Sequence, residues 1–243
     1  MSRRLFNAAF KNCFLLLYIN HNLKKFIKNP NINFDDKFAF AVKYLKKYHK
    51  DMHVDVKYYG LENIISKDVG CMFIGNHQGR NDCLTVLQGL EKHPSSFVVD
   101  DKRSHMFLFG NICDAFRAKR ICFDDLRSQL RVYNEMTLEL QEGKSFVLFP
   151  EAGYKNNKNT LLEFNTACFK PIIKSKCPIV PFVLYDSWKV FGTKGIKPLD
   201  VRCYFLPTIY YEEYKDMDKA CLTSYVKSKI QTKLDEIKSQ GDE

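Results

Sequence analysis

The chain has 243 residues, of which 45% are hydrophobic and 14% aromatic, so it can bury the core of one large α/β domain and is not mainly disordered. Its nine cysteines are odd in number and never form a Cys-x-x-Cys pair, which argues against a disulfide framework and a zinc cluster. The net charge is +10, and +9 of it lies in residues 1–50, where eleven Lys or Arg meet two acids. Such a segment predicts an anionic partner, either lipid headgroups or nucleic acid, with a merely solvated basic face as the alternative.

Residues 1–50 are predicted to form two helices that are separated by Asn29-Pro30-Asn31. At steps of 100°, the second helix, about residues 36–50, places its apolar residues and one histidine in a single arc: Phe38, Ala41, Val42, Leu45 and His49. Its lysines fall on a different side. This pattern is typical of an amphipathic helix at a membrane surface, and equally of a helix that packs on a protein core with its lysines in water.

The first helix favours the interpretation of residues 1–50 as a membrane-binding segment. Phe10, Phe14 and residues 15–19 are more apolar than the surface of a soluble protein usually is. Residues 5–19 are nevertheless too short and too often interrupted to span a bilayer, which takes about 20 residues. No small-residue cleavage site follows them, so a signal peptide fits poorly. We therefore expect residues 1–50 to be a two-helix membrane-binding appendage, which attaches a domain at residues 51–243 to the cytoplasmic face of the membrane as a peripheral or monotopic protein.

From residue 52 onward, the pattern changes to alternating strands and helices. Short β-rich runs are predicted at Val54–Tyr59, Cys71–Gly75, Ser96–Val99, Ile121–Phe123, Ser145–Phe149, Ile179–Leu184 and Val201–Phe205. The clearest helix between them covers residues 124–141 and ends before Gly143, where we expect a left-handed cap. A last helix is expected over about residues 217–239. This alternation predicts an α/β fold with a mixed, largely parallel sheet flanked by helices.

A histidine and an aspartate follow the run Cys71–Gly75. His77 is predicted to lie in the strand-to-helix loop and Asp82 in the first turn of the next helix, with Asn81 as its N-cap. On one continuous helix the two would lie about 140° apart, so a turn at Gly79 and Asn81 is needed to bring them together. A carboxylate on one imidazole nitrogen fixes the tautomer and leaves the other nitrogen to accept a proton. The pair is a candidate general base, and a capped turn with an incidental histidine is the alternative.

The segment Asn76-His77-x-x-x-x-Asp82 after a buried strand resembles the first motif of the phospholipid/glycerol acyltransferases, the glycerolipid acyltransferase superfamily. Three more segments resemble motifs of that family in the same order: Gly60–Ile64 its lead-in, Phe149–Gly153 its third motif Phe-Pro-Glu-Gly, and Pro178–Pro181 its fourth. One such motif is weak evidence, whereas four in order over about residues 57–190 are strong. The resemblance implies a glycerolipid acyltransferase-like fold.

The resemblance also implies the roles of individual residues. His77 would take the proton of the acceptor hydroxyl while Asp82 orients and stabilises the imidazolium, and the hydroxyl would attack a thioester without a covalent enzyme intermediate. The glycerol-phosphate end of the acceptor is expected to contact residues of the three motifs: Asn76, Arg80, Lys102, Arg120, Glu151, Ala152, Gly153 and Lys155.

The chain departs from the family pattern in two motifs. Ala152 stands where the family mostly has Gly, and Tyr154-Lys155 stand where many members have Thr-Arg-Ser. Lys155 could replace the missing Arg as a phosphate contact, although it lacks the guanidinium fork. The second motif is degenerate. We favour the register that uses Lys102 and Arg120, and Asp124–Arg127 is the other anchor for it.

The expected activity is transfer of a fatty acyl group from acyl-CoA or acyl-carrier protein to the free hydroxyl of 1-acyl-glycerol-3-phosphate, which gives phosphatidic acid. No metal or cofactor is expected, because histidines and cysteines lack ligand spacing and no glycine-rich phosphate motif is present. Glycerol-3-phosphate or another lysophospholipid remains open as the acceptor. A non-catalytic protein that binds anionic membrane or RNA is the alternative from another class. Because residues 51–243 are nearly neutral, we expect an anionic membrane surface, a lysophospholipid and an acyl donor as partners, and no nucleic acid.

Overall fold

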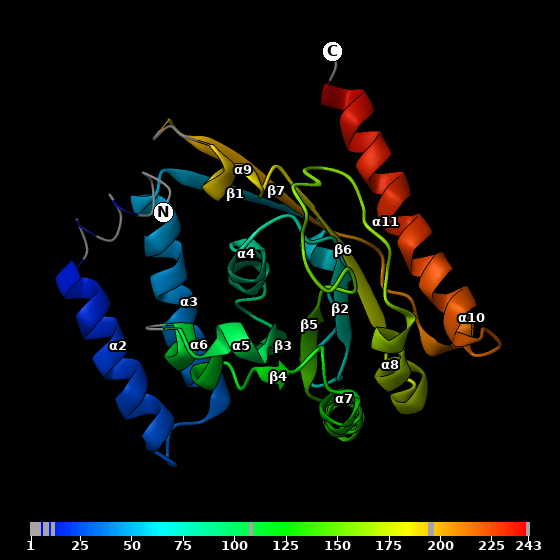
Figure 1. Ribbon diagram of the computed structural model, residues 1–243, viewed down its shortest axis with the longest axis horizontal. Coiled ribbons are helices and arrows are strands. Elements are labelled where there is room, and N and C mark those ends of the chain that lie inside the picture. The colour runs from blue at the N-terminus through cyan, green and yellow to red at the C-terminus, as the bar shows by residue number, and fades with distance from the viewer. Residues whose placement is uncertain (1–5, 7–9, 11–12, 107–108, 194–196, 242–243) are drawn as a thin grey trace.

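A seven-stranded sheet runs through the computed structural model, which describes residues 6, 10, 13–106, 109–193 and 197–241 (Figure 1). The strands are β1 (Val54–Tyr59), β2 (Met72–Gly75), β3 (Ser95–Asp100), β4 (Lys119–Ile121), β5 (Ser145–Leu148), β6 (Ile179–Tyr185) and β7 (Leu199–Phe205). Their order is β1-β7-β6-β2-β5-β3-β4. Neighbours from β6 to β4 pair in parallel, β7 is antiparallel to β6, and β1 is parallel to β7. The predicted mixed, largely parallel sheet is confirmed.

All seven predicted strands are present, and one is displaced. β4 begins at Lys119 and ends at Ile121, whereas we predicted residues 121–123. Lys119 and Arg120 fit this edge strand because acids neutralise them: Lys119 contacts Glu135 and Glu139, and Arg120 contacts Asp114. The apolar signal of Phe123 was misleading, because its side chain is 38% exposed in the following loop.

Helices cover both faces of the sheet (Figure 1). One face carries α2 (Cys13–Lys28), α3 (Phe34–Asp51), α4 (Asp82–Gly89) and α6 (Phe109–Ala115). The other carries α7 (Leu126–Gln141), α8 (Lys170–Ser175) and α11 (Lys219–Gly241). Successive residues of β2 alternate between these cores, with Met72 in the α7–α11 core and Phe73 in the α2–α6 core. Short helices occupy connections: η1 (Leu61–Asn63), α5 (Asp101–Ser104), η2 (Thr166–Phe169), α9 (Lys189–Gly192) and α10 (Tyr211–Tyr214).

The clearest predicted helix ends as expected. α7 runs from Leu126 to Gln141, and the Asp125 side chain accepts the N–H of Arg127 at its start. Gly143 follows the helix with a φ of 85°, the left-handed conformation that glycine adopts without a Cβ penalty. α11 corresponds to the expected last helix, displaced by two residues.

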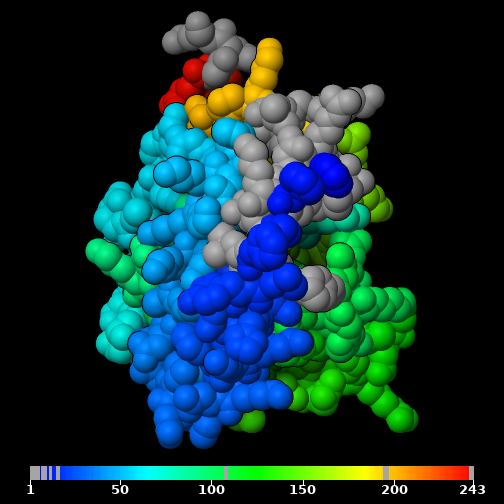
Figure 2. Space-filling view, turned by 90° about the vertical axis from the view of Figure 1, so that its left-hand side faces the viewer, coloured from blue at the N-terminus to red at the C-terminus, as the bar shows by residue number. Residues whose placement is uncertain are grey.

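The two predicted N-terminal helices are α2 and α3, and their apolar faces have different surroundings. All five residues of the predicted α3 arc are buried, and the four apolar ones pack in the same core as Phe73 of β2. For α3 the alternative of a core-packed helix is therefore the correct one, and its arc cannot face a membrane. On α2, Leu23 is buried, whereas Phe14 is 84% and Leu17 57% exposed. Figure 2 shows α2, in dark blue, on the surface of this side of the molecule.

Part of the predicted first helix, residues 5, 7–9, 11 and 12, lies outside the described residues. None of the described helices combines the length and the apolarity that crossing a bilayer requires.

Candidate active site

The candidate residues gather at one edge of the sheet. β2, β3, β5 and β6 are parallel, so the loops that follow them emerge at the same edge. His77 follows β2, Arg103 follows β3, Glu151 follows β5 and Ser187 follows β6. In open α/β sheets the carboxyl ends of the strands are where ligands bind.

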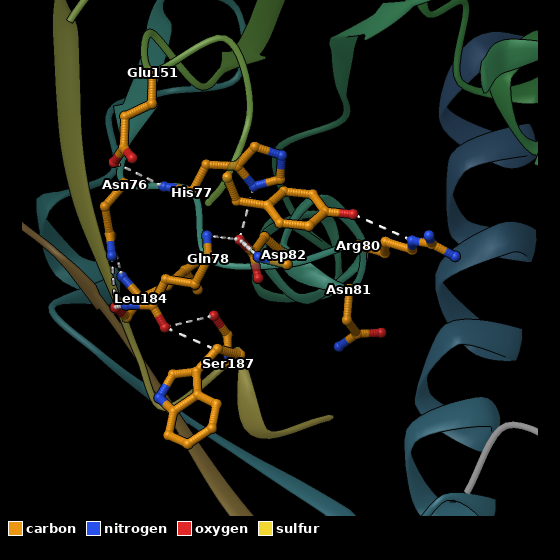
Figure 3. A network of polar contacts seen from close by, with 12 residues as sticks. Asn76, His77, Gln78, Arg80, Asn81, Asp82, Glu151, Leu184 and Ser187 are labelled. Atoms are coloured by element: carbon orange, nitrogen blue, oxygen red, sulfur yellow. Dashed lines mark hydrogen bonds and ion pairs between the residues drawn. The ribbon is translucent and has the colours of Figure 1, made fainter. Parts of the chain in front are cut away.

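His77 and Asp82 meet in this loop cluster, as the sequence pattern predicts (Figure 3). Nδ1 of His77 lies 2.8 Å from Oδ2 of Asp82, whose side chain is fully buried, while that of His77 is 19% exposed. The same Oδ2 also accepts the backbone N–H groups of Gln78 and Gly79. Three donors on one oxygen fix the carboxylate, which in turn fixes the imidazole.

Two aromatic rings contact the His77 ring. Phe149 stacks on it at a centroid distance of 4.5 Å, and Tyr154 meets it edge-on at 4.9 Å. Among the described residues, no hydrogen-bond partner is found for Nε2 of His77. The nitrogen that a general base uses is therefore open.

Asn81 does not cap α4, contrary to our prediction. It occupies the N-cap position with a helical backbone, φ −88° and ψ −12°, and makes no side-chain cap. Instead, the Asp82 carboxylate accepts hydrogen bonds from the N–H groups of the loop, and the Asn81 amide contacts His49 and Thr85. Figure 3 shows its side chain turned away from the His77–Asp82 pair.

Asn76 was expected to contact the substrate, but it is completely buried. Its Nδ2 donates to the carbonyl of Leu184 at 2.9 Å, and its Oδ1 accepts the Leu184 N–H at 2.7 Å. Gln78 likewise donates to Leu184 O and accepts from Ser187 Oγ at 3.0 Å. Both amides therefore anchor the His77 loop to β6 and are not exposed to an acceptor (Figure 3).

Glu151 holds the backbone of His77 by hydrogen bonds. Its Oε1 accepts the N–H of His77 at 3.1 Å, and Asn157 Nδ2 bridges Glu151 Oε2 and the carbonyl of His77. Burial raises the pKa of Glu151 to about 7, against the opposing effect of the N–H donors of His77 and Leu162. Ala152, the next residue, has a φ of 53°, which explains why glycine suits this position. Gly153 follows with a φ of 150°.

Two arginines converge on Tyr154. Arg80 Nε donates to the Tyr154 hydroxyl at 3.2 Å, and Arg103 Nη1 donates to it at 3.4 Å. The ring of Tyr154 is the one that contacts His77. Sequence reasoning named Arg80 but missed Arg103 and Tyr154. Their only signals were the position of Arg103 beside Lys102 and the replacement of the family's Thr by Tyr.

Two of the other predicted phosphate contacts, Lys102 and Arg120, pair with acids outside this cluster, and the third, Lys155, follows Tyr154 in the chain. Lys102 pairs with Asp124 at 2.7 Å, and both side chains are exposed. Arg120 donates to Ser104 Oγ at 2.9 Å and pairs with Asp114. The side chain of Lys155 is exposed.

Two further observations concern metal ligands and grooves. In the described ranges, no group of three or more His, Cys, Asp and Glu is placed to hold a metal ion. A groove of about 610 Å³ lies between β1, β7 and α11. Gly60 and Asn63 of the lead-in segment and Pro181 of the fourth-motif segment line it, whereas none of the loop residues described in this subsection does.

Comparison with known proteins agrees with this architecture. The family model described as Acyltransferase matches residues 55–185, more than half of the chain. The chloroplastic 1-acyl-sn-glycerol-3-phosphate acyltransferase BAT2 of Brassica napus is 29% identical over 159 residues, which are 62% of this chain and 44% of that protein. The match thus spans less than half the length of this relative.

A solved structure shows the same fold. It is the crystal structure of the 1-acyl-sn-glycerophosphate (LPA) acyltransferase PlsC from Thermotoga maritima, which is 17% identical and matches over 97% of both chains with a TM-score of 0.75. Because the Acyltransferase family model matches more than half of the chain, in a region that includes His77, Asp82 and Glu151, the chain belongs to the acyltransferase family.

Proposed function

We propose that this protein transfers a fatty acyl group from a thioester donor to the free hydroxyl of 1-acyl-glycerol-3-phosphate and so forms phosphatidic acid. The observation that carries the proposal is the open Nε2 of His77 beside Tyr154, where Arg80 and Arg103 converge. A base and a pair of guanidinium groups in one loop cluster match an acceptor with a hydroxyl and a phosphate. The name of the Brassica relative supports the same acceptor.

The reaction needs one proton carrier. Nε2 of His77 takes the proton of the acceptor hydroxyl as its oxygen attacks the thioester carbonyl, and a tetrahedral adduct forms. When the C–S bond breaks, the imidazolium returns the proton to the leaving sulfur, which departs as a thiol. Asp82 at 2.8 Å stabilises the imidazolium between these steps.

The phosphate of the acceptor is proposed to bind Arg80 and Arg103. The Tyr154 hydroxyl oxygen accepts from both guanidinium groups, as a phosphate oxygen would. Guanidinium forks match the geometry of phosphate oxygens, and two of them suit the two charges of a phosphate monoester. This favours lysophosphatidic acid over lysophosphatidylcholine, whose phosphate is a diester next to a cation.

The donor is proposed to be acyl-CoA or acyl-carrier protein, because the mechanism requires only a thioester. No cofactor takes part in the steps above.

We further propose that α2 attaches the protein to an anionic membrane on its cytoplasmic face. Phe14, Leu17 and Tyr18 are exposed on α2, and residues 1–50 carry a net charge of +9. Because α2 and α3 form a hairpin, the start of α2 lies at the same end of the molecule as the end of α3 (Figure 1). The end of α3 contacts Asn81 of the catalytic loop, so the exposed residues lie toward the site where a lipid acceptor would enter.

Thioester consumption measured separately with lysophosphatidic acid, glycerol-3-phosphate and lysophosphatidylcholine tests the proposal. We expect turnover to be fastest with lysophosphatidic acid and to be lost in a folded His77→Ala variant. Preference for lysophosphatidylcholine would overturn the acceptor assignment, and full activity of His77→Ala would overturn the mechanism.

A further inference from the structure

A buried histidine of the N-terminal hairpin contacts the helix that carries Asp82. His49 of α3 is 2% exposed. Its Nδ1 lies 2.6 Å from Oε1 of Gln88, and its Nε2 lies 2.9 Å from Nδ2 of Asn81. Asn81 Nδ2 also donates to Oγ1 of Thr85 at 2.9 Å.

These contacts define the proton positions on His49. The oxygen of Gln88 can only accept, so Nδ1 of His49 carries the hydrogen and donates it. Nε2 then accepts from the Asn81 amide, whose nitrogen is closer to it than its oxygen at 3.2 Å. The ring is therefore neutral, in keeping with the lowering of its pKa by burial.

The partners of His49 hold both ends of α4. Asn81 directly precedes Asp82, and Gln88 lies in the last turn of this eight-residue helix. So short a helix has little stability of its own, and no side chain caps its start. The Oδ1 atom of Asp82 is buried without a hydrogen-bond partner among the described residues, so it adds no restraint. The rotation of α4 is set by its buried face, where Val86 and Leu87 pack in the core, and the contacts of His49 at both ends of the helix add a restraint from α3.

We propose that His49 is a positioning residue for the His77–Asp82 pair, which makes the N-terminal hairpin a part of the catalytic unit. His49 keeps α4 at the rotation that sets Oδ2 of Asp82 at 2.8 Å from His77. The proposal rests on the proposed role of His77 as the general base. Misplacement of reacting groups by about 1 Å can cost about 10²-fold in rate, even when its cause lies outside the reacting groups.

The test uses His49→Leu, which fills similar space without hydrogen bonds, and His49→Gln, which can still donate to Gln88 and accept from Asn81. With a soluble short-chain acceptor, we expect His49→Leu to lower kcat by about 10–100-fold and to change KM less than about threefold. His49→Gln should recover most of kcat. Val42→Ala removes packing from the same helix and touches no polar group, so it should lower the melting temperature and leave kcat near wild type.

Further variants separate the possible failures. Wild-type kcat in a folded His49→Leu variant, alongside an inactive His77→Ala variant, would overturn the positioning role and leave the proposed function standing. Should His49→Leu not fold, Gln88→Leu breaks only the Nδ1 contact, and the same loss of kcat is expected at unchanged KM. Unchanged kcat in Gln88→Leu together with full loss in His49→Gln would contradict the hydrogen-bond mechanism.

Discussion

Oδ2 of Asp82 lies 2.8 Å from Nδ1 of His77 and accepts two backbone N–H groups of the same loop. This oxygen is therefore held in place before any substrate binds. A preorganised carboxylate stabilises the imidazolium at little cost in reorganisation, because its donors already point at it. In the proposed mechanism, the loop contributes to catalysis through this arrangement as much as through the histidine.

Asp82→Asn is expected to lower kcat by about 10²–10⁴-fold, because the neutral amide no longer stabilises the imidazolium or fixes the tautomer. Asp124→Asn is the matched control: Asp124 is exposed and ion-paired with Lys102, so its change should leave kcat within about twofold. Steady-state kinetics and thermal unfolding of both variants make the comparison. A folded Asp82→Asn enzyme with kcat close to wild type would contradict the assigned role.

Arg80→Ala and Arg103→Ala are each expected to raise the KM of lysophosphatidic acid by about 10-fold or more and to affect the donor KM little. A charge-assisted hydrogen bond contributes about 1.5–3 kcal/mol, which corresponds to this range. Arg103→Lys should recover little of it, because lysine lacks the fork. Lys102→Ala serves as the control, since its partner is Asp124. A larger acceptor effect from Lys102→Ala than from Arg103→Ala would place the phosphate at the predicted second motif instead.

The buried carboxyl of Glu151 should make stability depend on pH. Its pKa of about 7 in the folded protein exceeds the ordinary value of 4.5, so the folded state binds this proton more tightly than the unfolded chain. The resulting stabilisation is complete below about pH 4.5 and is lost as the pH rises through about 7. At about 1.4 kcal/mol for each pKa unit, the loss amounts to about 3 kcal/mol.

Glu151→Gln isolates this contribution, because the amide oxygen can still accept the N–H of His77 but cannot titrate. The free energy of unfolding of the wild type, relative to the variant, should fall by about 3 kcal/mol between pH 4.5 and pH 8. Denaturant unfolding at several pH values measures it. A difference between the two proteins that stays constant with pH would show that folding does not raise the pKa of Glu151.

The sequence predicted the sheet well because β2, β5 and β6 are covered on both faces and read as continuous apolar runs. It could not decide what covers α3, since lipid and a protein core select the same periodicity. The prediction that Asn81 caps α4 was wrong for a related reason. Capping rules consider only residues close in sequence, whereas the Asn81 amide binds His49, which lies 32 residues earlier in the chain. Arg103 was missed because the direction of side chains on the short helix α5 depends on tertiary contacts.

Membrane attachment should depend on α2 and not on α3. The α3 arc is buried in the core, so deletion of residues 1–50 is expected to unfold the protein, against the idea of a detachable appendage. Point substitutions avoid this problem. Phe14→Ser with Leu17→Ser replaces two exposed apolar side chains, 84% and 57% exposed, and should not affect the fold.

The double variant should bind anionic vesicles at least about tenfold more weakly, because each large apolar side chain contributes about 1.5–3 kcal/mol when it is fully buried. Leu138→Ser on α7 is the control, since Leu138 is 61% exposed on the opposite helical layer. High salt should weaken the wild type only in part, because it screens the basic residues and spares the apolar contacts. Activity should fall on bilayer-embedded acceptor and persist on a soluble short-chain acceptor. Sedimentation with vesicles measures binding, and equal binding of the wild type and the double variant would place the membrane contact elsewhere on the molecule.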